Sequence, residues 1–282
     1  MQGKRVLVTG ATDGIGLQAA VELAAMGASL HIVGRDPDKL GRAAQRVAEA
    51  AGGRPPATYL ADLSSQTSIR NLAAEVKANA PELDVLLNNA GGIFTSRQLS
   101  AEGLEMTFAL NHLGYFLLTH LLLESLTASP GIARVVNVAS AAHRGAKLDF
   151  DDLQGERSYS AWRAYQRSKL ANLYFTYELA QRVDPSHVTV NALHPGFVAS
   201  NFGGGAGGLI GWALGLGKRL AAIDVVKGAR TSVYLASSPE VLHVSGRYFE
   251  ACKPVQSSRT SYDQQAREHL WAVSERLTGI MP

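Results

Sequence analysis

Apolar and polar positions alternate along the chain in a pattern that predicts short buried strands separated by amphipathic helices. Short runs rich in branched aliphatic residues fit seven strands, at Arg5–Thr9, Ser29–Val33, Ala57–Leu60, Val85–Asn88, Arg134–Val138, Thr189–Leu193 and Arg247–Phe249. Helical spacing of apolar residues lies between them, at Leu17–Met26, Asp38–Ala51, Ser64–Asn79, Leu104–Leu126 and Trp162–Arg182. A terminal helix is expected at Tyr262–Leu277. Alternation of this kind predicts an α/β fold with a doubly wound, seven-stranded parallel sheet covered on both faces.

Composition supports one domain over residues 1–282. The chain is 46% hydrophobic and 18% charged, which suits one large core, and no linker rich in Pro or Ser divides it. Its net charge is +3 and the basic residues are scattered, so we expect no nucleic-acid surface. The single cysteine, Cys252, excludes an internal disulfide and fits a reducing compartment. No Cys or His spacing predicts a metal site.

The turn after the first strand has glycines where a dinucleotide-binding turn needs them. Gly10, Gly14 and Gly16 follow the predicted strand and lead directly into a helical pattern. Such glycines let the backbone approach a pyrophosphate, which is stabilised at the positive end of the helix. A tight connection without a ligand is the alternative, and the spacing directly behind a strand favours the dinucleotide.

Tyr165 and Lys169 stand one helical turn apart, which puts a phenol and an ammonium on the same helix face. A free tyrosine titrates near pH ~10, and a neighbouring cation stabilises its phenolate. We therefore expect Lys169 to lower the pKa of Tyr165 and to make it an acid/base group. The alternative, an ordinary solvated helix face, is disfavoured by the other motifs.

Motifs spread over nearly the whole chain resemble the short-chain dehydrogenase/reductase family. Thr9-Gly10-x-x-x-Gly14-x-Gly16 resembles its cofactor turn, Asn88-Asn89-Ala90-Gly91 its motif after the fourth strand, and Asn111, Ser140, Tyr165 and Lys169 its catalytic tetrad. The greatest similarity to the retinol dehydrogenase-like branch lies in the runs 111–114, 134–138, 168–172 and 194–196. The resemblance implies a single Rossmann-fold domain.

The resemblance also implies a mechanism. Ser140 would hydrogen-bond the substrate oxygen, and Tyr165 would exchange its proton with that oxygen. Lys169 would bind the nicotinamide ribose, and Asn111 would hold a water that connects Lys169 to solvent. Hydride would pass between nicotinamide and a small hydrophobic alcohol, aldehyde or ketone. His112, His143, His187 and His194 are expected to be structural or close to the substrate.

Gly34 and Arg35, at the end of the second predicted strand, favour NADP(H), because a guanidinium can bind a 2′-phosphate through paired hydrogen bonds. NAD(H) stays possible. Asp36 precedes Pro37 and is expected to cap the next helix. Asp62 resembles the family's adenine-binding acid. Alternatively, it is the cap of the predicted helix that begins at Ser64. The predicted cofactor-binding residues are Gly10, Thr12, Asp13, Gly14, Ile15, Gly16, Arg35, Asp62, Leu63, Asn89, Ala90, Gly91, Tyr165, Lys169, Pro195, Gly196 and Val198.

An apolar, glycine-rich tract at Phe202–Gly217 ends at Lys218-Arg219. It is shorter than the ~20 residues of a membrane span. We expect a substrate lid near residues 199–224; a subunit contact and interfacial membrane contact are the alternatives. The chain enters its first strand without room for a signal segment, so we expect no transmembrane segment and a cytoplasmic protein. Whether it is a monomer or a homo-oligomer is left open.

Two other functional classes share these features. A noncatalytic dinucleotide sensor would have the same fold but typically lacks the Tyr/Lys pair, which is intact here. An epimerase or dehydratase would use the same pair but usually has a longer carboxyl-terminal substrate domain, and only about ninety residues follow Gly196. Turnover of NADPH with carbonyl compounds separates an enzyme from a sensor, and product analysis separates a reductase from an epimerase.

Overall fold

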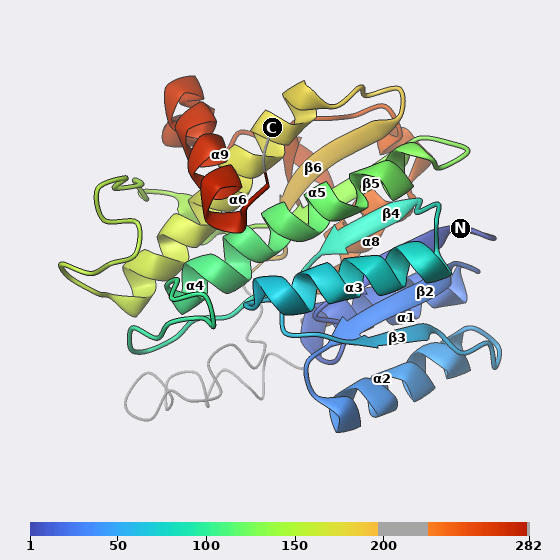
Figure 1. The fold of residues 1–282 in the computed structure, drawn as a ribbon. Coiled ribbons are helices and arrows are strands. Elements are labelled where there is room, and N and C mark those ends of the chain that lie inside the picture. Colours follow the sequence, from blue (N-terminus) through green and yellow to red (C-terminus); the bar gives the residue numbers. More distant parts are fainter. Residues whose placement is uncertain (197–224, 281–282) are drawn as a thin grey trace.

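The computed structural model describes residues 1–196 and 225–280. Within them, eight strands form one sheet, which lies between two layers of helices (Figure 1). The strands are β1 (Arg5–Thr9), β2 (Ser29–Gly34), β3 (Ala57–Leu60), β4 (Val85–Asn88), β5 (Ala133–Val138), β6 (Val188–His194), β7 (Arg247–Glu250) and β8 (Lys253–Val255). Their order across the sheet is β3-β2-β1-β4-β5-β6-β7-β8. The first seven pair in parallel, which confirms the predicted doubly wound α/β fold.

The eighth strand was not predicted. β8 has three exposed residues, one of them Pro254, and pairs antiparallel with β7 at the sheet edge. A two-residue turn joins the two strands, and its residues Ala251 and Cys252 have φ of 48° and 63°. Hairpin turns with two positive φ values usually carry Asn or Gly. Neither the turn residues nor the short exposed strand therefore gave a signal in the sequence.

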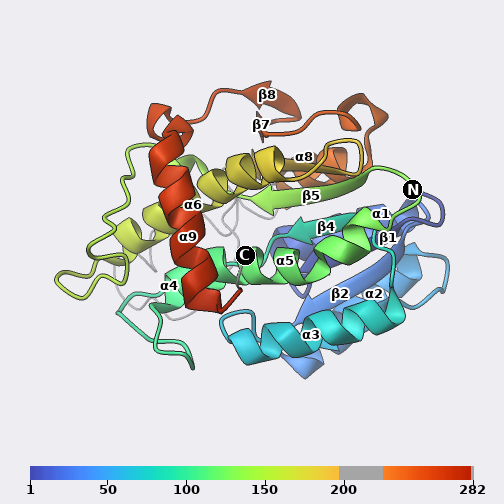
Figure 2. The ribbon, with the colours of Figure 1, turned by 45° about the horizontal axis from the view of Figure 1, so that its top comes forward.

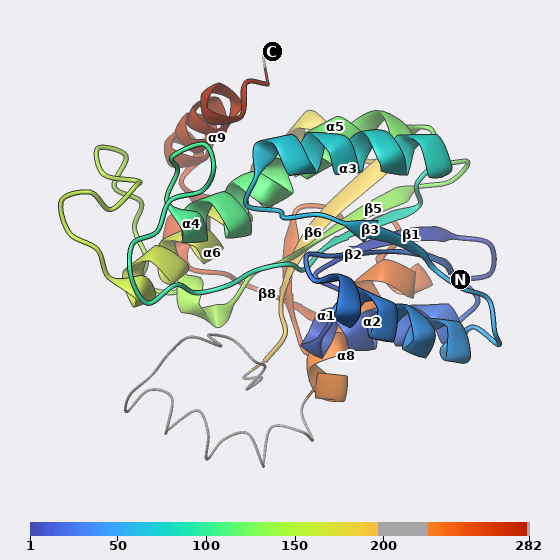
Figure 3. The same cartoon turned by 60° about the horizontal axis from the view of Figure 1, so that its bottom comes forward.

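The helical elements within the described residues are α1 (Gly14–Ala25), α2 (Pro37–Ala50), α3 (Gln66–Asn79), α4 (Met106–Phe108), the π-helix η1 (Ala109–Leu113), α5 (Gly114–Thr127), the 3₁₀ turn η2 (Ala141–His143), α6 (Ala161–Arg182), α8 (Val225–Ser237), the 3₁₀ turns η3 (Pro239–Val241) and η4 (Arg259–Tyr262), and α9 (Gln264–Thr278). Figure 3 shows α1, α2 and α8 on one face of the sheet, and α3 and α5 on the other.

Side chains alternate between these two layers along each strand. In β1, Val6 and Val8 belong to the core under α1 and α8, whereas Leu7 belongs to the core under α3 and α5. This is the period of two expected for a strand buried on both faces. Each fully buried aliphatic side chain contributes about 1.5–3 kcal/mol, so the two cores hold the strand ends in fixed positions.

The apolar segment predicted at Leu104–Leu126 forms one helical path, Met106–Thr127, through α4, η1 and α5. Among the described residues it is the one helix whose length and apolar character would suit a membrane span, and 72% of its most apolar window is buried inside the fold. Core helices meet the same criterion, and packing of this helix on the sheet accounts for its composition. The π-turn at Ala109–Leu113 was not predicted.

The terminal helix α9 lies across α5 and α6 (Figure 2). Trp271 on α9 is 6% exposed, and its ring meets Phe116 edge-on at a centroid distance of 5.1 Å. Ser274 Oγ lies 2.9 Å from Nε2 of His112. The expected terminal helix therefore exists, and it packs on the domain's own core.

Candidate active site

Parallel pairing brings the predicted motifs to the carboxyl-terminal edge of the sheet. Gly10 follows β1, Asn89 follows β4, Ser140 follows β5 after one residue, and Pro195 follows β6. These strands are neighbours in the order β1-β4-β5-β6. The edge of an open α/β sheet where the strand order reverses is the position at which such folds bind ligands.

The turn between β1 and α1 has a shape that only glycine permits. Gly10 and Gly14 have φ of +64° and +53°, in the left-handed region. A Cβ on Gly10 would lie 2.8 Å from Cα of Ala90, and one on Gly16 would overlap the carbonyl oxygen of Gly10. Asp13 caps α1 by accepting a 2.7 Å bond from Gly14 N. The turn thus presents backbone at the positive end of a helix, which fits a pyrophosphate.

Hydrogen bonds of Asn89 and Thr9 fix the conformation of this turn. Nδ2 of Asn89 donates to the carbonyl oxygens of Thr9 and Gly10, at 3.0 and 3.2 Å. The hydroxyl of Thr9 accepts bonds from the backbone N–H groups of Asn89 and Ala90, at 2.9 and 3.1 Å. Asn89, predicted to bind cofactor, therefore supports the glycine turn. Thr9 was not among the predicted site residues, although its place at the strand end in the glycine motif is a signal that could have identified it.

The end of β2 lies beside the same turn. Gly34 has no room for a Cβ, which would overlap Cγ2 of Thr12. Asp36 caps α2 and accepts a 3.0 Å bond from Lys39 N, as predicted. Arg35, between them, is exposed. The carboxylate nearest the strand end is thus engaged in a helix cap, and the guanidinium is free to turn toward a ligand.

Asp62 and Leu63 follow β3. Asp62 is exposed, and its Oδ1 accepts bonds from the backbone N and the hydroxyl of Ser64, at 2.9 and 2.7 Å. It therefore stabilises the turn before α3, whose cap is Ser65. The Leu63 side chain is buried in the core, so only its backbone is available to a cofactor. Adenine recognition by Asp62 stays a prediction.

The helix α6 places Tyr165 and Lys169 on one face, as their spacing predicts. Nζ of Lys169 lies 5.7 Å from the centroid of the Tyr165 ring and donates a 2.9 Å bond to the carbonyl oxygen of Val138. Tyr165 is hydrogen-bonded to the side chain of Ser140. Three members of the predicted tetrad are therefore in direct or near contact.

The pKa of Tyr165 differs from the one that the sequence predicts. Burial raises the pKa of Tyr165, and the bond to Ser140 offsets only part of that effect. Burial also lowers the pKa of Lys169 to about 7. The predicted lowering of the Tyr165 pKa is therefore wrong for this structure, because burial penalises the phenolate more than the bond to Ser140 stabilises it. The sequence shows the spacing of the pair but not its burial.

Asn111 lies in the π-turn η1 and joins the loop after β4 to α6. Its Nδ2 donates to the Gly92 carbonyl at 2.9 Å and to the Ser168 hydroxyl at 3.0 Å, and its Oδ1 accepts from Gly92 N at 2.8 Å. A Cβ on Gly91 would lie 3.1 Å from Oδ1 of Asn111 and 3.6 Å from Nζ of Lys169. Asn111 is thus beside Lys169, with its amide engaged. The water that it is expected to hold stays a prediction.

Some predicted residues are not placed by the structure. Pro195 and Gly196 follow β6, and Gly196 has φ of +90°. Val198 and the predicted lid near residues 199–224 lie outside the described residues. Within residues 1–196 and 225–280, no group of three or more His, Cys, Asp or Glu side chains could hold a metal ion.

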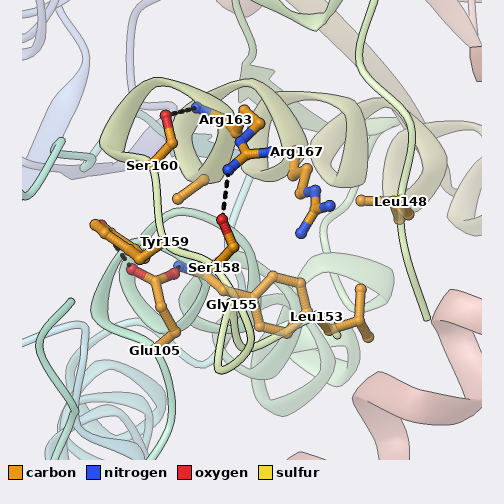
Figure 4. A pocket seen from close by; sticks show the side chains of 11 residues that line it. Glu105, Leu148, Leu153, Gly155, Ser158, Tyr159, Ser160, Arg163 and Arg167 are labelled. Carbon is orange, nitrogen blue, oxygen red and sulfur yellow. Dashed lines mark hydrogen bonds between the residues drawn. The ribbon is translucent and has the colours of Figure 1, made fainter. Parts of the chain in front are cut away.

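A pocket of about 400 Å³, open to solvent, is lined by the start of α6 and by the segment before that helix (Figure 4). Its polar side chains bond one another or nearby backbone. Glu105 caps α4 at Thr107 N and Phe108 N, and Nη2 of Arg163 donates to the Ser158 hydroxyl at 2.9 Å. Neither Ser140, Tyr165 nor Lys169 lines the pocket. Its polar groups have structural partners, and we assign it no chemistry.

Comparison with known proteins agrees with this geometry. The sequence profile described as short chain dehydrogenase matches residues 4–206. Retinol dehydrogenase 14 of Homo sapiens is 40% identical over 303 aligned positions that cover 100% of this chain and 88% of that protein. The crystal structure of an uncharacterized protein from Mycobacterium Paratuberculosis has a TM-score of 0.80, with 33% identity and coverage of 99% and 94%. A short chain dehydrogenase from Shigella flexneri, solved with NADP, has a TM-score of 0.68, with 25% identity and coverage of 90% and 98%.

Proposed function

The chain belongs to the short-chain dehydrogenase family, similar to its retinol dehydrogenase-like branch, and on that premise we propose an NADP(H)-dependent oxidoreductase for hydrophobic alcohols and carbonyls. The observation that carries this proposal is the hydrogen bond between Tyr165 and Ser140, with Nζ of Lys169 5.7 Å from the centroid of the Tyr165 ring. This arrangement can hold a carbonyl oxygen and give it a proton.

The residues present fit a nicotinamide dinucleotide. The glycines of the Gly10–Gly16 turn carry no side chain that would block a pyrophosphate. The turn leads into the N-terminus of α1, where the backbone N–H groups are available to an anion. Arg35 is exposed beside the turn, while Asp36 is engaged by Lys39. A guanidinium without a competing carboxylate favours the 2′-phosphate of NADP(H). The Shigella flexneri neighbour, solved with NADP, supports the same choice.

The chain's own groups account for the proton in the reaction. Ser140 Oγ accepts a 3.2 Å bond from Ala142 N, so its hydroxyl hydrogen is available to the substrate oxygen or to Tyr165. In carbonyl reduction Tyr165 gives its hydroxyl proton to that oxygen, and in alcohol oxidation it takes the proton back. A proton on Lys169 would stabilise the Tyr165 phenolate at that moment. Bound NADP(H) would supply or accept the hydride.

An exposed aromatic residue supports a hydrophobic substrate. Trp162 is 55% exposed, and its ring centroid lies 5.9 Å from that of Tyr165 one turn further along α6. An apolar surface beside the proton donor favours an apolar substrate. The relatives named for retinol point to the same class of alcohol.

Turnover of NADPH with a panel of aldehydes and ketones tests the proposal, with Tyr165→Phe as the matched variant. Removing only the hydroxyl should reduce turnover on the order of 10²-fold or more and leave NADPH binding nearly unchanged. Activity of the variant within a few-fold of wild type would remove Tyr165 from the chemistry. No turnover at all by wild type would indicate a sensor, and product formed without net NADPH consumption would indicate an epimerase or dehydratase. Cytoplasmic location stays a prediction, and the oligomeric state stays open.

A further inference from the structure

His143 is a fully buried imidazole three residues after Ser140, at the end of η2. Its Nδ1 lies 2.6 Å from the carbonyl oxygen of Ser140, and its Nε2 lies 3.0 Å from the backbone nitrogen of Ser258. A backbone N–H can only donate, so Nε2 accepts and the ring hydrogen is on Nδ1. The ring is therefore a neutral Nδ1–H tautomer that links Ser140 to Ser258, which is 115 positions from His143 along the chain.

The segment on the far side of this link is itself tied to the catalytic helix. The Tyr177 hydroxyl lies 2.7 Å from Oγ of Ser257, and the Tyr174 hydroxyl donates a 3.1 Å bond to the Thr260 carbonyl. Tyr174 and Tyr177 are on α6, the helix that carries Tyr165 and Lys169. Residues 257–260 therefore form a support that is fixed to α6, and His143 connects that support to Ser140.

We propose that His143 is a positioning residue that fixes Ser140 against Tyr165 by bridging the η2 turn to residues 257–260. The inference rests on the proposed function. Ser140 begins η2, and its hydroxyl contacts both Ala142 N and Tyr165. Rotation of the turn would carry Ser140 Oγ away from the reacting oxygen. A misplacement of ~1 Å at such a site can reduce the rate ~10²-fold.

A packing role alone is the alternative. The His143 ring meets Tyr248 edge-on at a centroid distance of 5.2 Å, so the imidazole also fills core space. The two roles differ at the hydrogen bonds: packing needs the ring volume, whereas positioning needs Nδ1–H and an acceptor at Nε2. A variant that breaks the bond at Nε2 and keeps the imidazole tests the positioning role.

Ser258 offers such a variant. Its φ is −66°, which proline can adopt, and its own hydroxyl has no hydrogen-bond partner. Ser258→Pro removes the N–H that donates to His143 and puts the proline Cδ against Nε2, so it breaks the link while keeping the imidazole. Ser258→Ala removes only the hydroxyl and is the matched control. We expect kcat to fall on the order of 10-fold or more in Ser258→Pro, with the KM for NADPH within a few-fold of wild type, and neither to change in Ser258→Ala.

The pH profile gives a second readout that a packing role would not move. Burial lowers the pKa of His143, the bond to Ser140 raises it, and the charges of Arg144 and His194 lower it. Tyr248 packs against the ring without a charge. The Ser258 N–H stabilises the neutral ring, so its loss in Ser258→Pro should shift the acid limb of kcat to higher pH. The acid limb of Ser258→Ala should coincide with that of wild type.

Crystal structures of the two Ser258 variants decide the inference even if the proposed function fails. A shift of Ser140 Oγ away from Tyr165 in Ser258→Pro alone supports the link. An unmoved Ser140 overturns it, as does an unchanged kcat in a folded Ser258→Pro protein that turns over. Because the proline ring also presses on Nε2, His143→Asn against His143→Ala is the second comparison, and it stands alone if Ser258→Pro does not fold. Asn keeps a donor toward Ser140, so it should recover part of the kcat lost in Ala; equal kcat in both variants overturns the link.

Discussion

The glycine turn and the catalytic face are built in different ways. At the turn, backbone atoms of Gly10, Gly16 and Ala90 approach so closely that no side chain fits. At the catalytic face, the tetrad is held by side-chain bonds to distant elements. The link from His143 to Ser258 spans 115 positions, and the one from His112 to Ser274 spans 162.

This difference determines how each region tolerates change. Steric exclusion at the turn is local, because it involves two adjacent strands and depends on one residue type at each position. The catalytic face depends on buried neutral imidazoles: protonation of His143 removes the acceptor at Nε2, and protonation of His112 puts a charge in the core. We expect the turn to be sensitive to volume and the catalytic face to be sensitive to pH and to remote substitutions.

Gly16→Ala should produce the largest effect. The new Cβ would overlap the Gly10 carbonyl oxygen and Nδ2 of Asn89, and the Gly10 backbone has no free space in which to move. Overpacking of this kind destabilises by about 1–3 kcal/mol, and the displaced turn should weaken NADPH binding on the order of 10²-fold. Fluorescence titration with NADPH measures the affinity, and thermal unfolding measures the stability.

Gly41→Ala is the matched control for that variant. Gly41 lies in α2, and a Cβ there would meet nothing within 4 Å. Alanine in an exposed helix should stabilise the protein by roughly 0.5–1 kcal/mol and leave NADPH binding unchanged. Equal behaviour of the two variants would show that the turn is not sterically restricted.

Arg35→Ala should produce the next effect, because it removes a charge from the edge of the turn and leaves the backbone intact. A charge-assisted bond to the 2′-phosphate is worth ~1.5–3 kcal/mol, so kcat/KM for NADPH should fall roughly 10- to 100-fold while that for NADH changes little. Arg46→Ala, an exposed position on α2, is the control. Similar efficiency of wild type with both cofactors would contradict the assignment of NADP(H).

The sequence predicted those parts of the molecule that depend on local rules. The seven parallel strands, the cap at Asp36 and the Tyr165–Lys169 face all follow from periodicity, capping preference or helical spacing. The same rules could not give the pKa direction of Tyr165, because that depends on how deeply the fold buries the pair. They also gave no signal for the His143 link, because its partner is a backbone N–H in a distant segment.

Lowering the pH should reduce the free energy of unfolding, because His112 on the catalytic side becomes protonated more easily in the unfolded state. This effect is intermediate in size. His112 is buried, and burial lowers its pKa to about 3. The unfolded-state value is near 6.5, so its contribution to stability is complete above ~6.5 and is lost as pH falls toward ~3. Between about pH 8 and about pH 5 the loss should be about 2 kcal/mol.

Urea unfolding of His112→Asn at both pH values measures that contribution. The variant should lose about 2 kcal/mol less than wild type between the two conditions, because its amide does not titrate. His243→Asn, at an exposed position, is the control and should follow wild type. A wild-type pH slope that is unchanged in His112→Asn would show that His112 is not the group responsible.

Trp162→Ala should have the smallest effect, because it changes only the exposed rim of the catalytic face. Its indole offers apolar surface beside Tyr165 without contributing to the fold's core. Burial of roughly 40 Å² of substrate against it would contribute about 1 kcal/mol, or about a fivefold gain in kcat/KM. Across straight-chain aldehydes, kcat/KM should therefore rise with chain length in wild type and less steeply in Trp162→Ala. Trp162→Phe keeps an aromatic ring and should retain most of the rise; parallel slopes in all three proteins would show that the substrate does not extend over Trp162.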